Sequence, residues 1–429
     1  MSDTTASEGF DGFTELEPQP FTPSFDPRTL DDLRARLRSA RWPDIVGADD
    51  WRYGVPQEWL RDMVAWWADS WDADAAVAAM NRWEHHRVVI DGVLIHYLRA
   101  PGVGPNPKPL ILTHGWPWTF WDFKDVIGPL SDPGAHGGDP ADAYDVIVPS
   151  LPGFGFSTPL RAAGIGVPQV AERWVRLMRE VLGYDTFCAH GGDWGAIVTS
   201  WLAHAHAEHL IGAHMSLPVV PGVNRRELGD RWADDEAWMP VRMAEVEPLI
   251  RSHVTVHTLD PQTLAYGLVD SPVGTAAWLW ERRRNWSDCD GDVESVFSRD
   301  HLCTTAALYW CTGAIGSSLR LYHEHFGNPP GIAHDRMPRM EAPCAFAIFP
   351  KELVLLPRSV AEEYSDLRRW TLMEAGGHFA APEQPAALVE DLRAFFGALP
   401  ELGSDPAFPL SGHASARTAS STRKRESGV

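Results

Sequence analysis

A glycine-rich stretch in the middle of the chain holds the residue best suited to covalent chemistry. The stretch, Gly191–Gly195, reads GGDWG, with Asp193 at its centre. A pattern typical of a short buried strand precedes it at 184–188, and a helical pattern follows it at 197–202. Small residues around Asp193 suit a tight strand-to-helix turn, here called the elbow, because such a turn strains the residue at its tip and brings backbone against backbone. A carboxylate held there can attack saturated carbon and form an enzyme ester, which water must then cleave. Taken alone, the stretch also fits an ordinary turn with a solvated Asp.

A second motif, HGWP at His114–Pro117, directly follows a strand pattern at 110–113. In the α/β-hydrolase fold, a nucleophile on such an elbow lies beside the loop that follows a neighbouring strand. The backbone N–H of Trp116, together with that of Trp194, can then form an oxyanion hole. The alternative is a plain strand-to-loop turn, but the strand context and the spacing to Asp193 favour the functional interpretation.

One of the 18 histidines, His378, stands out by its position. It follows two glycines after the last predicted strand, 369–373, where the base of such a hydrolase belongs in chain order. The orienting acid should follow the preceding strand, 345–349. Glu352 is the best candidate, because a buried carboxylate there would hold the imidazole tautomer and stabilise its cation. The alternatives, on an expected surface helix or loop, are Asp366, Glu362 and Glu363.

Strand patterns alternate with helical patterns through much of the chain, which predicts a mostly parallel, doubly wound sheet of the α/β class. Asp91-Gly92, between two β-branched runs, predicts a type I′ hairpin that leads into the sheet. A helical stretch rich in Trp, Pro and Arg interrupts the alternation and is expected to cap the carboxyl edge of the sheet, where α/β proteins bind ligands. The expected segments are a disordered 1–18, a helical N-terminal domain at 19–96, the first part of an α/β-hydrolase core at 97–217, a helical cap at 218–340, the second part of the core at 341–400 and a disordered tail at 401–429.

The composition excludes several classes of partner. A net charge of −21 argues against nucleic acid and against an anionic membrane. The 5 cysteines are scattered and odd in number, which suggests reduced thiols and a cytoplasmic location. We see no apolar core of a signal peptide and no run of about 18 apolar residues for a transmembrane anchor. Four histidines after the elbow lack the partners of a tetrahedral metal site, so neither a metal nor another cofactor is expected. They are His204, His206, His209 and His214.

Together these motifs resemble the microsomal-type epoxide hydrolases of the α/β-hydrolase superfamily, including their helical N-terminal domain. The resemblance covers roughly residues 19–400 and rests on Trp83–His96, His114–Pro117, Gly191–Gly195, Pro261–Gly274, Leu308–Tyr322, Phe349–Glu352 and Gly376–Ala380. It implies that Asp193 is the nucleophile, Glu352 the acid and His378 the base. It also implies two cap tyrosines that donate hydrogen bonds to the epoxide oxygen, at Tyr322 and at position 253.

Position 253 departs from the family pattern, because His253 stands where a tyrosine is expected. Tyr266 would take the place of that tyrosine only if the cap folded differently. A histidine can donate a hydrogen bond when its nitrogen carries a proton, but its pKa lies near neutrality and its reach differs from that of tyrosine.

The resemblance implies a hydrolase acting on ether bonds, which opens an apolar epoxide to a vicinal diol in the metabolism or detoxification of xenobiotic or natural-product epoxides. The implied reaction needs only the epoxide substrate and water. The sequence does not distinguish a monomer from a homo-oligomer. The 20 tryptophans suit an apolar pocket and core packing equally well. A haloalkane-type dehalogenase would share the Asp nucleophile, but Tyr322 and the N-terminal helices argue against it. A non-catalytic binder on the same scaffold is favoured only by His253.

Overall fold

The structure, a computed structural model, describes residues 10–46, 49–224, 228–229 and 231–399. Its centre is a nine-stranded sheet with the order β1-β2-β3-β5-β4-β6-β7-β8-β9. The pairs from β1 to β5 are antiparallel, and every pair from β5 through β4 to β9 is parallel. The predicted α/β-hydrolase fold with a mostly parallel sheet is confirmed. The strands are β1 (Gln19–Phe21), β2 (Glu84–Ile90), β3 (Val93–Ala100), β4 (Lys108–Thr113), β5 (Tyr144–Pro149), β6 (Phe187–Gly191), β7 (Leu210–Met215), β8 (Met340–Ile348) and β9 (Ser365–Leu372).

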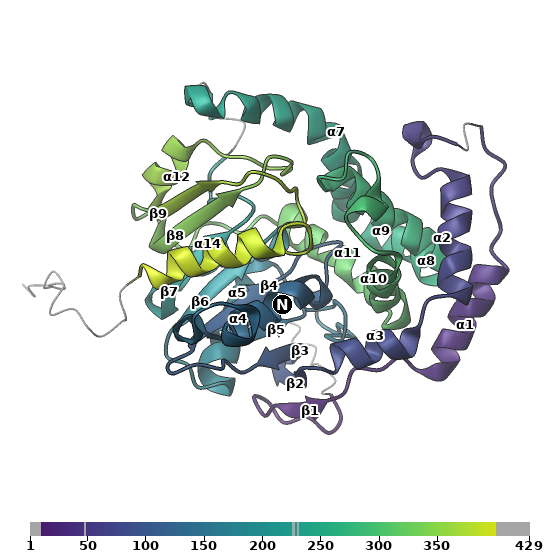
Figure 1. Ribbon diagram of the computed structural model, residues 1–429, viewed down its shortest axis with the longest axis horizontal. Helices are drawn as coiled ribbons and strands as arrows, with labels where there is room; N and C mark the ends of the chain where they lie inside the picture. Colours follow the sequence, from purple (N-terminus) through teal and green to yellow (C-terminus); the bar gives the residue numbers. More distant parts are fainter. Residues whose placement is uncertain (1–9, 47–48, 225–227, 230, 400–429) are drawn as a thin grey trace, which may run out of the picture. The chain divides into compact units, whose positions relative to one another are not determined.

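Helices cover both faces of this sheet (Figure 1). The helices α4 and α14 pack against each other on one face, and α5 and α6 pack together on the other. The helices are α1 (Pro27–Arg38), α2 (Gln57–Asp69), α3 (Ala73–Met80), α4 (Lys124–Ser131), α5 (Val167–Arg176), α6 (Trp194–Ala205), α7 (Trp238–Leu259), α8 (Pro261–Asp270), α9 (Pro272–Trp286), α10 (Arg299–Cys311), α11 (Ala314–Tyr322), α12 (Arg358–Tyr364), α13 (Ala380–Glu383) and α14 (Pro385–Gly397).

The N-terminal part of the chain follows local sequence signals closely. Asp26 caps α1 by accepting the N–H of Thr29 at 3.0 Å, and Pro27 opens the helix. Between β2 and β3, Asp91 and Gly92 both have positive φ, 50° and 67°, as a type I′ turn requires. The predicted hairpin is therefore present in the structure.

Disorder is predicted at both ends of the chain, and the structure describes part of one of these ends, residues 10–18. Residues 1–9 and 400–429 lie outside the described part of the chain, so the expected tail at 401–429 cannot be compared with it. Residues 10–18, however, contact the sheet: the N–H of Leu16 donates to the carbonyl of Val89 at 2.9 Å, and Glu15 accepts the N–H of Asp91. The polar sequence of this segment does not indicate the contact, because backbone pairing at a sheet edge needs no apolar side chains.

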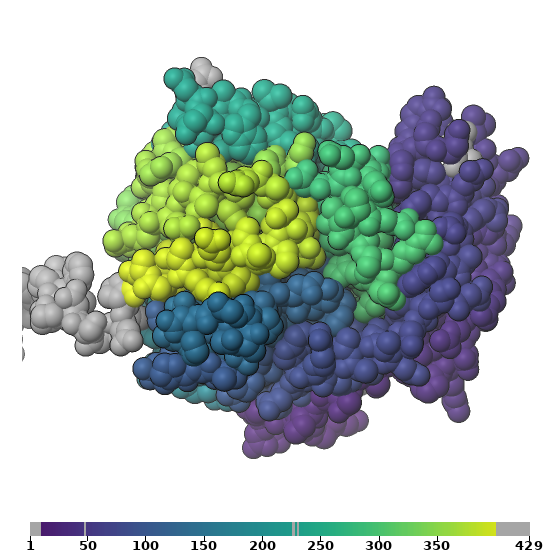
Figure 2. Space-filling model, viewed as in Figure 1, coloured from purple at the N-terminus to yellow at the C-terminus, as the bar shows by residue number. Residues whose placement is uncertain are grey.

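Between β7 and β8 the described residues form only helices and turns, with α7 to α11 as the cap. The cap packs on the N-terminal helices: Trp59 donates its indole N–H to Glu294 at 2.9 Å, and Trp71 donates to Thr304 at 3.1 Å. In the space-filling view the N-terminal and cap helices form adjoining surfaces (Figure 2).

A buried ion pair joins the cap to the HGWP loop. Arg283 of α9 lies 2.6 Å from Asp122, with side chains 1% and 0% exposed. Burial by itself would raise the pKa of Asp122, but the charge of Arg283 and a hydrogen bond with His301 hold that pKa well below its usual value. Arg283 also donates to the carbonyl of Pro117 at 3.0 Å, and Tyr309 of α10 donates to that of Trp118 at 2.7 Å. The cap is therefore fixed to the loop that carries Trp116.

Replacing Arg283 should test how much this ion pair contributes to stability. Arg283→Met leaves the Asp122 carboxylate buried without its partner, which should lower the free energy of unfolding by about 3–5 kcal/mol. The control is Arg38→Met, which removes an exposed pair with Asp69 at 2.7 Å, and exposed pairs contribute about 1 kcal/mol or less. Denaturant unfolding followed by tryptophan fluorescence measures both variants. Equal, small losses for both would contradict the assignment.

Candidate active site

The elbow holds Asp193 in a strained backbone conformation immediately after β6. Asp193 has φ 51° and ψ −126° and caps the N-terminus of α6. The glycines around it are needed for space: a Cβ on Gly195 would lie 1.8 Å from the carbonyl oxygen of Thr113 on β4, and one on Gly191 would lie 2.1 Å from the carbonyl of Gly195. A Cβ on Gly115 would lie 2.1 Å from Asp193 Oδ1. The HGWP loop and the elbow are thus in contact, and glycine permits the contact.

A histidine that follows one strand contacts Asp193, and a glutamate that follows another strand contacts this histidine. His378, after β9, places Nε2 at 3.2 Å from Asp193 Oδ2, and its Nδ1 lies 2.7 Å from Glu352 Oε1, after β8. His378 and Glu352 are 1% and 0% exposed. The alternative acids are elsewhere, in surface ion pairs: Asp366 with Arg368, Glu362 with Arg358 and Glu363 with Arg231. The structure therefore brings together the Asp193–His378–Glu352 set that the sequence predicts.

The two carboxylates determine the charge of His378. Burial would lower the pKa of His378, but Glu352 and Asp193 outweigh burial and raise it to about 10. At neutral pH the imidazole is therefore protonated and lies between two negative charges.

The predicted oxyanion donors flank the same carboxylate. The backbone N–H of Trp116 donates to Asp193 Oδ1 at 2.7 Å. Trp194 is the first residue of α6, where backbone N–H groups have no partner within the helix. His114 of the same motif has a different position: its Nε2 accepts the N–H of Leu151 at 3.1 Å, which holds the loop to the segment that follows β5.

The cap supplies two polar side chains above Asp193. Tyr322 ends α11, and its hydroxyl is buried without a hydrogen-bond partner among the described residues. His253 of α7 stacks on Trp116 with ring centroids 5.4 Å apart and meets Tyr322 edge-on at the same distance. Tyr266 is 72% exposed on α8 and does not substitute for a residue at position 253.

His253 is neutral in this environment. Burial lowers its pKa well below the usual value, and the nearby His257 and Arg282 act in the same direction. Its neighbour His257 accepts the indole N–H of Trp278 at 3.0 Å, so the proton of neutral His257 resides on the other nitrogen. A neutral imidazole at position 253 has one N–H to donate.

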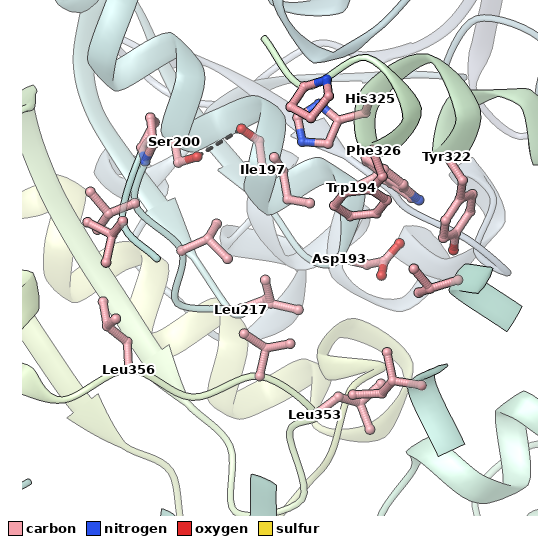
Figure 3. A pocket seen from close by; sticks show the side chains of 18 of the residues that line it. Asp193, Trp194, Ile197, Ser200, Leu217, Tyr322, His325, Phe326, Leu353 and Leu356 are labelled. Carbon is pink, nitrogen blue, oxygen red and sulfur yellow. Dashed lines mark hydrogen bonds between the residues drawn. The ribbon is translucent and has the colours of Figure 1, made fainter. Parts of the chain in front are cut away.

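One cavity of about 820 Å³ joins these groups, with Asp193, His253, Tyr322 and His378 on its wall. Figure 3 shows the Tyr322 hydroxyl on the side of the cavity that Asp193 borders. Most of the remaining wall is apolar, with residues from α6, α7 and the segments after β7, β8 and α11. They include Ile197, Leu217, Val220, Met243, Phe326 and Leu356. The volume of the cavity lies within the range of small-molecule sites.

The histidines set aside in the sequence have structural partners. Ala333 donates to His204 Nε2 at 2.9 Å, so His204 Nδ1 carries the proton and donates to the carbonyl of Arg339 at 2.8 Å. His214 lies 2.9 Å from Asp391. Across the described ranges, no group of three or more His, Cys, Asp or Glu side chains could hold a metal ion. No helix in the same ranges is long and apolar enough to cross a bilayer.

Sequence reasoning did not find three residues near the site: His257, Trp286 and Glu383. Trp286 lines the cavity and packs edge-on against His378, with ring centroids 5.4 Å apart. Glu383 lies five positions after His378 and contacts its loop. No local pattern distinguishes these residues from others of their type, because their roles come from contacts between distant segments.

Substituting the elbow glycine should damage the fold far more than substituting an open one. Gly195→Ala places a Cβ against the Thr113 carbonyl, where β4 and β6 leave no room for relaxation, and should cost at least about 3 kcal/mol of unfolding free energy. Gly267→Ala is the control: nothing lies within 4 Å of its Cβ in α8, so it should gain about 1 kcal/mol. Thermal unfolding compares the two, and equal stability would disprove the close approach.

The comparisons with known proteins agree with this geometry. The family model "Epoxide hydrolase N terminus" matches residues 18–123, and "alpha/beta hydrolase fold" matches residues 108–249. Similar proteins include "Putative epoxide hydrolase" of Stigmatella aurantiaca, 38% identical over 88% of this chain and 84% of its own length. "Epoxide hydrolase 1" of Oryctolagus cuniculus is 31% identical over 90% of each chain.

Solved structures extend the likeness to three dimensions. The juvenile hormone epoxide hydrolase of Bombyx mori has a TM-score of 0.76 at 25% identity, covering 90% of this chain and 95% of its own. The epoxide hydrolase of Aspergillus niger also has a TM-score of 0.76, at 26% identity, covering 89% and 97%. Because the likeness spans most of each protein in sequence and in structure, this chain belongs to the epoxide hydrolase family of the α/β-hydrolase superfamily.

Proposed function

We propose that this enzyme opens an apolar epoxide to a vicinal diol through an ester on Asp193, which water activated by His378 then hydrolyses. The observation that carries the proposal is one apolar cavity in which the Tyr322 hydroxyl lies on the side that Asp193 borders (Figure 3), with His378 in contact with that carboxylate. The relatives are named epoxide hydrolases, enzymes that hydrolyse the ether bond of an epoxide.

In the first step a carboxylate oxygen of Asp193 attacks an epoxide carbon. The carbon–oxygen bond of the ring breaks, and its electron pair goes to the epoxide oxygen. Oδ1 accepts the N–H of Trp116 at 2.7 Å, whereas Oδ2 makes a longer contact, 3.2 Å, with His378 Nε2. Oδ2 is therefore the attacking oxygen, and Oδ1 becomes the ester carbonyl. Burial and the charge of Asp193 raise the pKa of Tyr322 well above its usual value. Tyr322 is therefore a neutral phenol that can donate its proton to the opening ring.

Ester formation changes the charge around His378. It removes the negative charge of Asp193, one of the two charges that raise the pKa of His378, while burial continues to lower it. The imidazole then gives up its proton, which restores the Tyr322 phenolate left by the first step to a phenol, and becomes a general base. Glu352, at 2.7 Å, remains to hold its tautomer and to stabilise the cation that forms next.

In the second step His378 takes a proton from water, and the hydroxide adds to the ester carbonyl carbon of Asp193. The tetrahedral oxyanion forms at Oδ1, where the N–H of Trp116 already donates and that of Trp194 is adjacent. Collapse breaks the bond to the alkyl oxygen, which takes the proton from His378 and leaves as the diol. The carboxylic acid left on Asp193 then gives its proton to His378, which restores the carboxylate beside the protonated imidazole.

Blocking the second step should trap the ester. With His378→Gln, the intact protein incubated with an epoxide should gain the mass of one substrate molecule, because alkylation does not need the base. Asp193→Ala should show no adduct and no diol. His136→Gln, an exposed histidine, is the matched control and should turn over as the parent does.

The origin of the diol oxygen tests the same scheme independently. With excess enzyme in ¹⁸O-water, the first turnover should yield unlabelled diol, because its new oxygen comes from Asp193, and the label should enter Asp193. Label in the first diol, or no adduct on His378→Gln with an epoxide that the parent hydrolyses, would exclude the covalent route.

Removing the cap donors should slow alkylation. Tyr322→Phe should lower the alkylation rate about 100-fold, the usual cost of one donor to a developing oxyanion. His253→Phe should also slow it, and His253→Tyr should preserve turnover because it restores the pair implied by the resemblance. Rapid-quench mass spectrometry measures alkylation directly, with Tyr266→Phe, exposed on α8, as the control. An unchanged rate for Tyr322→Phe would remove Tyr322 from the mechanism.

The alternatives have distinct signatures. A dehalogenase with the same nucleophile would release halide from a haloalkane and leave epoxides intact. A binder would hold epoxides tightly and yield no diol. A panel of aryl and aliphatic epoxides and haloalkanes, assayed for diol, halide and binding, separates the three functions.

A further inference from the structure

A carboxylate outside the catalytic set contacts the backbone on both sides of His378. Glu383, the last residue of α13, accepts the N–H of Phe379 at Oε1, at 2.7 Å, and the N–H of Gly377 at Oε2, at 2.9 Å. The same Oε2 accepts the N–H of Asp288 at 2.6 Å, from the segment that follows α9 of the cap. The partly buried side chain thus receives three N–H groups, two from the loop of the base and one from the cap.

The loop of the base, residues 376–379, is bonded to this cap segment at two further points. The N–H of Gly376 donates to Asp288 Oδ2 at 3.0 Å, and the N–H of His378 itself donates to the carbonyl of Trp286 at 2.9 Å. The approach is close: a Cβ on Gly377 would lie 2.8 Å from the carbonyl oxygen of Trp286 and 2.9 Å from the backbone nitrogen of Asp288. Gly377 therefore permits the cap and this loop to lie backbone against backbone.

We propose that Glu383 is a positioning residue: it fixes the backbone around His378 against the cap segment 286–288, so that the imidazole stays in reach of Asp193. The inference rests on the function proposed above. The distance from His378 Nε2 to Asp193 Oδ2 is already long, at 3.2 Å. A small shift of the loop therefore takes the imidazole out of contact with the carboxylate. Displacements of about 1 Å can cost a reaction 100-fold.

Loss of Glu383 should slow ester hydrolysis but not alkylation of Asp193. Asp193 is held by the elbow between β6 and α6, and Tyr322 by α11, and neither contacts Glu383. Alkylation should therefore proceed without Glu383. Ester hydrolysis needs His378 beside the ester carbonyl and should slow.

Glu383→Gln separates these two halves. Its single carbonyl oxygen can replace only one of the two carboxylate oxygens, and its NH₂ group then faces a backbone N–H, donor against donor. We expect the adduct to form at a rate within about twofold of the parent and to decay about 10- to 100-fold more slowly after the epoxide is removed. Intact-protein mass spectrometry follows both rates. Glu390→Gln, exposed on α14, is the matched control and should change neither.

A second variant probes the loop from the cap side. Asp288→Ala removes the acceptor of the Gly376 N–H and keeps the backbone N–H that donates to Glu383. It should also slow decay of the adduct selectively, by a smaller factor. It keeps the test decisive if Glu383→Gln fails to fold, which circular dichroism would reveal.

The outcomes are distinguishable. Unchanged decay in both variants, or equal slowing of formation and decay in folded protein, would overturn the positioning role of Glu383. A parent enzyme that forms neither adduct nor diol with any epoxide of the panel would instead refute the proposed function.

Discussion

The site depends on how closely the backbone of β4 approaches the elbow after β6. The carbonyl of Thr113 occupies the place of any Cβ at Gly195, and Gly115 lies against the Asp193 carboxylate. This approach holds Asp193 at a positive φ and brings the N–H of Trp116 within 2.7 Å of it. The strain is maintained by the parallel ladder on both sides of β6, which leaves the turn no alternative course. The position of the Asp193 carboxylate and that of the Trp116 N–H are thus two results of one packing constraint.

Much of this arrangement could be predicted from the sequence, because strand order in the chain sets which loops meet at the sheet edge. Glu352 and His378 follow consecutive strands, and chain order alone assigned them. The boundaries were less predictable: β6 was expected at 184–188 and lies at Phe187–Gly191. Its last residues, Ala189, His190 and Gly191, give little hydrophobic signal. Strand β1 has three residues, too few to show a period.

Contacts between distant segments could not be predicted from the sequence. No pattern indicates that α7 places His253 on the face of Trp116, or that Glu383 receives N–H groups from two separate segments. Such contacts depend on the path of the cap between β7 and β8, and that path is set by buried pairs such as Arg283 with Asp122. The residue type at position 253 could be noticed as unusual, but its neutral state is a consequence of burial that only the packing reveals.

The anchoring of the cap divides the cavity into two parts with different freedom to vary. The part near Trp116, Trp286 and His378 is hydrogen-bonded to the loops that hold Trp116 and His378, so substitutions there should disturb the proposed active site. Other lining residues, such as Val219, Val223 and Ile332, are aliphatic and carry none of the groups of the proposed reaction. Mutations of these residues can alter which substrates fit while leaving those groups in place. The architecture therefore gives evolution, or a protein engineer, a separate region in which selectivity can change.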